Sequence, residues 1–125
     1  MTIAYLCVVV SLFIPLACVA YAKLSTKGYD NRAPREFLDR LEGKSKRAHY
    51  AQDNFYETFP AFGIGVVVAH QMGGAQSTID ALAIVYVLAR ISYAIFYILD
   101  KHSLRTLVWF GGFSATIALF FVGWR

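Results

Sequence analysis

Four long apolar stretches divide the chain, and each is about as long as a helix that crosses a membrane. They cover residues 3–23, 46–72, 77–99 and 103–124. About 20 predominantly apolar residues are needed to span a bilayer as an α-helix. Short connections between stretches favour antiparallel neighbours. The pattern therefore predicts an all-α protein, an integral membrane four-helix up-and-down bundle that forms a single domain.

Local signals refine the ends of these helices. Pro15 lies inside the first stretch and predicts a kink there. The only long hydrophilic segment, residues 24–45, contains Pro34, which suits the first position of a short helix running to about Glu42. Gly43 is expected to close that short helix.

Further expectations concern side-chain pairs and caps. The short helix carries the i,i+4 pairs Arg35–Asp39 and Glu36–Arg40, which favour salt bridges on its surface. Ser77 or Thr78 is expected to cap the third stretch, with Asp80 favourable in its first turn. In the fourth stretch, small residues at i,i+4 spacing predict close helix packing; they are Gly111, Gly112, Ala115 and Thr116.

Composition agrees with a membrane protein. Hydrophobic residues make up 58% of the 125 residues and charged residues 16%, against about 45–50% and about 25% in soluble domains. Mean hydropathy is +0.49. The net charge of +4 is concentrated in one loop and gives no case for nucleic acid. Of the 12 Lys and Arg, most lie in that loop and at its borders: Lys23, Lys27, Arg32, Arg35, Arg40, Lys44, Lys46 and Arg47.

The placement of positive charge predicts an orientation. Besides the first loop, the third loop region carries Lys101 and Arg105, the second loop carries no basic residue, and the chain ends show only Arg125. Basic loops stay on the cytoplasmic side. The first and third loops are therefore expected in the cytoplasm and both termini outside it.

Polar residues enter the second stretch on one face. Arg47, Tyr50, Asn54 and Glu57 follow spacings of 3, 4 and 3. An amide and a carboxylate within a membrane helix are costly unless they face a cavity or a partner. This face is therefore a candidate binding site, although side chains lying in the headgroup layer would need no ligand.

A second polar stripe runs along the third stretch. Tyr86, Arg90, Tyr93 and Tyr97 follow spacings of 4, 3 and 4, and Arg90 lies about 15 Å below the end of the helix. A guanidinium at that depth needs a carboxylate or several acceptors, and Glu57 is the candidate within the chain. A contact between these two side chains could form a binding site or could serve helix packing alone.

Together these groups fit a small ligand with two anionic groups and an ammonium group, held beside a lipid-soluble reactant. Arg105, one turn into the fourth stretch, points toward the same membrane level. Two cysteines, Cys7 and Cys18, are about 16 Å apart on one helix and do not suggest a disulfide. The histidines show no metal-ligand spacing, and no metal site is predicted.

The motifs resemble those of the MAPEG family, the membrane-associated proteins in eicosanoid and glutathione metabolism. The segment Asn-Phe-Tyr-Glu-Thr-Phe-Pro at 54–60 is similar to the family's second-helix motif. Residues 89–97 with Arg105 resemble the third-helix motif and following arginine of its leukotriene- and prostaglandin-forming synthases. Residues 29–35 resemble the small bacterial members.

The resemblance implies a homotrimer that binds glutathione as co-substrate between neighbouring subunits, and the likeness to bacterial members indicates a bacterial inner membrane. The placement of positive charge then puts both termini in the periplasm. Arg105 would hold the sulfur as thiolate. Tyr50 stands where the family motif has an arginine, and Lys23 stands for the basic residue that ends the first helix. Arg47 is the nearest substitute for the motif arginine. The residues expected to bind glutathione are therefore Arg47, Asn54, Glu57, Arg90, Tyr93 and Tyr97.

The implied activity is a glutathione-dependent transferase or peroxidase acting on lipophilic electrophiles or hydroperoxides. Its partners would be other copies of the chain, membrane lipid and a lipophilic small molecule, without nucleic acid. Two alternatives of other classes stay open: a non-catalytic membrane scaffold of the same fold, and a small multidrug-type transporter. The transporter design requires a carboxylate at mid-bilayer in the first helix, and residues 3–22 contain no charged side chain.

Overall fold

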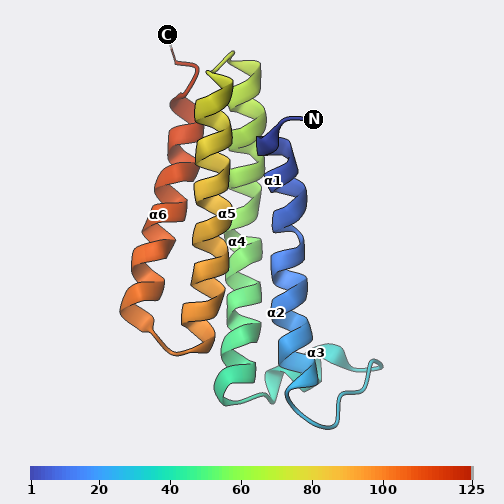
Figure 1. Ribbon diagram of the computed structural model, residues 1–125. Helices are drawn as coiled ribbons and strands as arrows, with labels where there is room; N and C mark the ends of the chain where they lie inside the picture. Colours follow the sequence, from blue (N-terminus) through green and yellow to red (C-terminus); the bar gives the residue numbers. More distant parts are fainter. Residues whose placement is uncertain (125) are drawn as a thin grey trace.

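The computed structural model describes residues 1–124, and its regular structure there consists entirely of α-helices (Figure 1). Arg125, the terminal charge counted for the orientation, lies outside the described residues. The prediction of an all-α chain is confirmed. The helices are α1 (Ile3–Ser11), α2 (Phe13–Leu24), α3 (Pro34–Asp39), α4 (Gly43–Gln71), α5 (Gln76–Ile98) and α6 (His102–Phe121).

The long helices run side by side, with α1 and α2 following one another along one rod (Figure 1). Helix α5 packs against α6, α4 and α1, and α2 packs against α4. The short helix α3 lies across the end where α2 finishes and α4 begins, and the α5–α6 turn lies at the same end. The expected second and fourth stretches, 46–72 and 103–124, thus correspond to α4 and α6 with small shifts at their ends.

Three helical segments are long and apolar enough to cross a membrane: Ile3–Leu24, which combines α1 and α2, together with α5 and α6. The protein is therefore an integral membrane protein by its helices' length and composition. Helix α4 is longer than any of these, but its first half carries five charged side chains. These are Lys44, Lys46, Arg47, Asp53 and Glu57.

The first rod is interrupted at Leu12, one turn before Pro15. Pro15 has no N–H to donate to the Ser11 carbonyl, and its ring crowds that carbonyl. The backbone tightens there, so that the Leu12 N–H donates to the Val9 carbonyl at 3.2 Å. The effect of Pro15 is therefore an interruption of the helix at Leu12, next to the position of the lost hydrogen bond, and the expected kink stays a prediction.

The hydrophilic segment differs from its predicted form. Helix α3 ends at Asp39, and Gly43 begins α4 with a φ of +59° instead of closing α3. The last carbonyls of α3 receive their hydrogen bonds from α4, because Lys46 Nζ donates to Leu38 at 3.1 Å and to Asp39 at 2.9 Å. This lysine removes the need for a glycine cap and fixes α3 on the start of α4.

Neither of the ion pairs expected on α3 forms within the described chain. Arg40 instead donates from Nε to the backbone carbonyl of Glu36 at 3.3 Å. Both side chains are exposed, where an ion pair gains little over hydration. The guanidinium of Arg40 therefore keeps its terminal nitrogens available.

The capping prediction for the third stretch was wrong. Helix α5 has Ala75 at its N-cap and receives no side-chain cap. Asp80 serves α1 instead: its Oδ1 accepts from the Ala4 N–H at 2.8 Å and from Gln76 Nε2 at 2.8 Å. A carboxylate beside the first turn of α1 also matches the positive end of that helix.

Glycine permits a close approach of α4 and α6. A Cβ at Gly65 would lie 3.1 Å from Phe120 and 3.2 Å from Leu119, whereas a Cβ at Gly63 would meet nothing within 4 Å. The surrounding core includes the stacked rings of Phe62 and Tyr86, whose centroids are 3.7 Å apart. Two glycines of one helix therefore offer a matched test of this packing.

We expect Gly65→Ala to lower the melting temperature in mild detergent, because the added methyl forces α4 and α6 apart at a cost of about 1–3 kcal/mol. Gly63→Ala should keep or raise it, since alanine favours helix by about 1 kcal/mol. Thermal unfolding followed by circular dichroism measures both. Equal melting temperatures for the two variants would contradict the close approach.

Candidate functional site

The polar residues of α4 and α5 meet at Arg90. This arginine lies in the middle of α5 and is only 3% exposed. Its Nη2 donates to Asn54 Oδ1 at 2.9 Å, and Asn54 Nδ2 donates in turn to Glu57 Oε2 at 3.2 Å. The amide of Asn54 thus connects the buried guanidinium to the exposed carboxylate.

This arrangement corrects the expected direct contact between Arg90 and Glu57. Within residues 1–124 no ion pair joins them, because Asn54 stands one turn earlier on α4 and occupies the position nearest the guanidinium. A neutral acceptor leaves the positive charge only partly compensated. In addition, Arg90 Nε is buried and has no acceptor among the described residues. Buried guanidinium donors of this kind fit a ligand that supplies further acceptors.

A cavity of about 260 Å³ opens beside these groups, between α4, α5 and α6. One side is polar, with the hydroxyls of Thr58 and Tyr86 3.5 Å apart. The other side is apolar and aromatic. The lining residues are Asn54, Glu57, Thr58, Ala61, Tyr86, Arg90, Trp109, Gly112, Phe113 and Thr116. The cavity therefore offers charged groups and an apolar wall to the same occupant.

A row of cations and aromatic rings leads from the cavity toward the α5–α6 turn. The guanidinium of Arg90 lies 4.4 Å from the ring centroid of Tyr93, and Tyr93 meets Tyr97 edge to face at 5.6 Å. The guanidinium of Arg105 lies 4.2 Å from the ring of Tyr97. Tyr93, Tyr97 and Arg105 do not line the cavity itself. The two predicted polar stripes thus meet at Arg90. Some of their residues line the cavity, and the others form the adjoining row.

Arg47 lies apart from the cavity. Its Nε donates to the backbone carbonyl of Ile98 at 3.1 Å, which satisfies a carbonyl in the last turn of α5. Tyr50, at the position where the family motif has arginine, is half exposed, with its ring centroid 6.3 Å from that of Tyr97. Arg47 therefore fastens α4 to the end of α5 in this chain, at the same end as the row.

The sequence alone did not single out the cavity residues of α6. Trp109 and Phe113 stack with centroids 5.2 Å apart, and Gly112 with Thr116 lies on the adjoining face. The i,i+4 spacing of the small residues predicts helix packing and gives no sign of a cavity. Gly112 does have that role, since a Cβ there would lie 3.3 Å from the Cβ of Ala89. Thr58 is a further lining residue that the sequence did not single out, whereas Tyr86 belongs to the predicted polar stripe of the third stretch and does line the cavity.

Comparison with known proteins gives a single result. A family model described as the MAPEG family matches residues 1–124, which include every residue of the cavity and the row. No curated protein and no solved structure matches the chain.

Proposed function

The chain belongs to the MAPEG family, as its motifs indicated, and from this premise we propose that it is a membrane-bound, glutathione-dependent transferase or peroxidase acting on lipophilic electrophiles or hydroperoxides. The observation that carries the proposal is the hydrogen-bonded series from Arg90 through Asn54 to Glu57 beside a cavity with an apolar wall. Ionisable groups in a membrane helix mark a functional site by default.

The chemistry of glutathione fits these groups. The molecule carries two carboxylates, one ammonium group and a thiol. Arg90 offers buried donors to a carboxylate, and the exposed carboxylate of Glu57 suits the ammonium group. Within the row, Tyr93 and Tyr97 supply hydroxyl donors. The apolar wall formed by Trp109 and Phe113 would face the lipophilic reactant.

We place the thiol near Arg105. A thiol with an ordinary pKa of about 8.5 is mostly protonated at pH 7, and a nearby guanidinium raises the thiolate fraction. Arg105 lies in the first turn of α6, where the helix dipole also favours an anion. The thiolate would then attack a reactant that arrives from the lipid. Attack on an electrophilic carbon would form a thioether and expel the leaving group of that carbon. Attack on a hydroperoxide oxygen would break the O–O bond, giving glutathione sulfenic acid and an alkoxide that takes up a proton, and a second glutathione would then convert the sulfenic acid into glutathione disulfide and water.

The proposal includes a homotrimer in which α4 is a fourth membrane span. The cavity of about 260 Å³ within one chain is smaller than the 300–1,000 Å³ typical of small-molecule sites. Glu57 is exposed on its rim. A neighbouring subunit would enlarge and cover the site, which supports binding of glutathione between subunits.

We expect three chains when the protein is weighed by native mass spectrometry in mild detergent. Phe62→Ala, in the core of the subunit, serves as a control that weakens the subunit without touching its outer surface. A monomer that binds glutathione with unchanged affinity would contradict the shared site.

A non-catalytic scaffold is the second candidate function. It is favoured by one observation: Arg90 already has an acceptor within its own chain, so its contact with Asn54 fixes α4 against α5 without a ligand. A scaffold of this kind would keep the fold and bind no glutathione.

Calorimetric titration separates the two functions. Glutathione should bind the purified protein, and an analogue with a methyl group in place of the thiol should bind nearly as well, since the carboxylates and the ammonium group carry the affinity. Glu57→Gln should weaken both ligands alike. Absence of binding by a folded trimer would leave the scaffold, and a screen for conjugation and peroxidase activity then decides whether binding leads to turnover.

The proposed orientation places both termini in the periplasm. Cysteines introduced at Asn31, in the first loop, and at Ser77, at the start of α5, should differ in labelling by a membrane-impermeant maleimide in intact cells. Both positions are exposed. Ser77→Cys should be labelled and Asn31→Cys protected, with the wild-type protein giving the background from Cys7 and Cys18. Labelling of Asn31→Cys in intact cells would reverse the orientation.

A further inference from the structure

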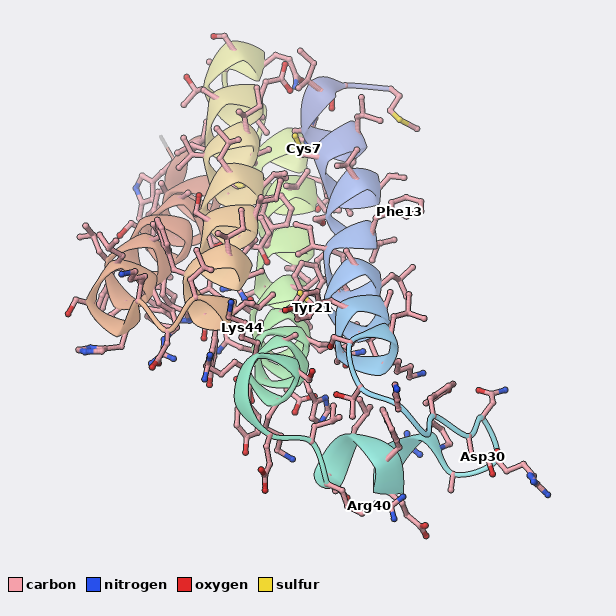
Figure 2. All side chains as sticks on the ribbon, turned by 60° about the horizontal axis from the view of Figure 1, so that its bottom comes forward. Cys7, Phe13, Tyr21, Asp30, Arg40 and Lys44 are labelled. Atoms are coloured by element: carbon pink, nitrogen blue, oxygen red, sulfur yellow. The ribbon has the colours of Figure 1, made fainter. Side chains whose placement is uncertain are left out.

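A second cavity, of about 310 Å³, lies in the hydrophilic segment between the end of α2 and α3. It shares no lining residue with the cavity between α4, α5 and α6. Figure 2 shows Arg40 at the end of α3 on the loop side of the molecule. The lining residues are Thr26, Lys27, Gly28, Phe37, Arg40 and Leu41.

Two cations from different elements face this cavity without a carboxylate. The ion pairs among residues 1–124 are Arg32–Asp30 and His49–Asp53, so neither Lys27 nor Arg40 takes part in one. Arg40 uses Nε for the Glu36 carbonyl and leaves its terminal nitrogens free of protein acceptors in this part of the chain. Two uncompensated cations beside one hollow make a site for an anion.

The frame of the cavity is fixed on both sides by the first turn of α4. Thr26 Oγ1 donates to Ser45 Oγ at 3.0 Å, which holds the residue before Lys27. On the other side Lys46 holds the end of α3, where Arg40 follows, through the carbonyls of Leu38 and Asp39. The cations are therefore attached to backbone that is already ordered, which lowers the entropic cost of binding.

The cavity also lies at a defined depth. The first membrane segment, Ile3–Leu24, has 22 residues, so as a helix it is about 33 Å long and crosses the hydrocarbon core of about 30 Å. Thr26 and Lys27 follow it directly, at headgroup level. The buried side chains of Phe37 and Leu41 give the cavity an apolar wall.

We propose that this cavity binds a phosphate group, carried by the headgroup of an anionic phospholipid of the same leaflet. Lys27 and Arg40 would hold the phosphate oxygens, and Phe37 with Leu41 would contact the glycerol and the first methylenes of the lipid. Depth and the apolar wall favour a lipid over a soluble phosphate ester. The proposal is independent of glutathione binding.

Native mass spectrometry of the full-length protein with phosphatidylglycerol or phosphatidylcholine in mixed micelles tests it. The wild type should retain phosphatidylglycerol preferentially. The double variant Lys27→Gln/Arg40→Gln should bind it roughly 10- to 30-fold more weakly, since two basic contacts are lost. The control Arg35→Gln/Lys44→Gln removes the same charge from exposed positions outside the cavity and should keep the wild-type affinity.

The outcomes separate the possible ligands. If sn-glycerol 3-phosphate binds alone with the same dependence on Lys27 and Arg40, the phosphate site stands and its ligand is soluble. If both double variants bound phosphatidylglycerol equally weakly, the lipid would be attracted to the basic loop in general, and the proposed site would be overturned. Unchanged lipid retention in Lys27→Gln/Arg40→Gln would overturn it as well. Lys27→Arg, which keeps the charge, should retain binding.

Discussion

Arg105→Ala should slow turnover of a lipophilic acceptor about 10²–10³-fold, while glutathione affinity falls much less. The guanidinium lies 4.2 Å from the ring of Tyr97 and in the first turn of α6. In our proposal it stabilises the negative charge on sulfur, and removing one such donor from a water-poor site typically costs about 3–4 kcal/mol in the transition state. The proposal places the carboxylates of glutathione at other residues, so binding should depend less on Arg105.

The measurement combines two readouts. Thiolate absorbance in the ultraviolet on adding glutathione should disappear in Arg105→Ala, and the single-turnover rate should fall with it. Lys101→Ala is the matched control and should change neither readout, because Lys101 is an exposed basic residue at the N-cap of α6. Tyr97→Phe keeps the ring under the guanidinium and should preserve the thiolate signal. If Arg105→Ala forms thiolate and turns over as the wild type does, Arg105 has no role in the chemistry.

The long helices were predictable because their signal is local. A run of apolar residues at membrane length specifies a helix without reference to its neighbours. The start of α4 was less predictable, since Gly43 could close one helix or begin the next. The choice depends on Lys46, which donates to the carbonyls of α3 from the following helix.

Contacts between helices could not be predicted from the spacing of residues along the chain. The spacing of Asn54 and Glu57 placed both on one face of α4, and both line the cavity. Which of them meets Arg90 depends on the relative height of α4 and α5, and a helical wheel carries no information on height. The role of Asp80 depends on helix packing in the same way. Its position suggested a role in the first turn of α5, but its carboxylate accepts from the N–H of Ala4 in α1, a residue 76 positions earlier in the chain.

The proposal of glutathione as the ligand rests on the motifs and not on periodicity. The stripes of Arg90, Tyr93 and Tyr97 predicted polar groups that need a partner, and the structure places them in one connected row. Nothing in that geometry names a tripeptide thiol. Family membership supports the proposed class of ligand, and the structure limits how this chain could hold such a ligand. Arg47, for example, donates from Nε to the Ile98 carbonyl, so only its terminal nitrogens could serve a ligand.

Asn54→Leu should destabilise the folded protein by about 3 kcal/mol. The substitution removes the acceptor 2.9 Å from Arg90 Nη2, and Nε of the same guanidinium has no acceptor among the described residues. A buried charge left without its hydrogen-bond partner costs more than the partner contributed. The melting temperature in detergent, without glutathione, measures this loss.

A second substitution, at Arg90, then separates the role of Asn54 in packing from its role in ligand binding. Arg90→Met/Asn54→Leu should recover much of the stability lost in Asn54→Leu, because the uncompensated charge is removed together with its partner. Asn54→Asp should retain stability, since a carboxylate oxygen can accept from the same guanidinium. Glutathione should bind neither Asn54→Leu nor the double variant, whatever their stability. A double variant that melts below Asn54→Leu would mean that Arg90 stabilises the fold through other contacts, such as its ring contact with Tyr93.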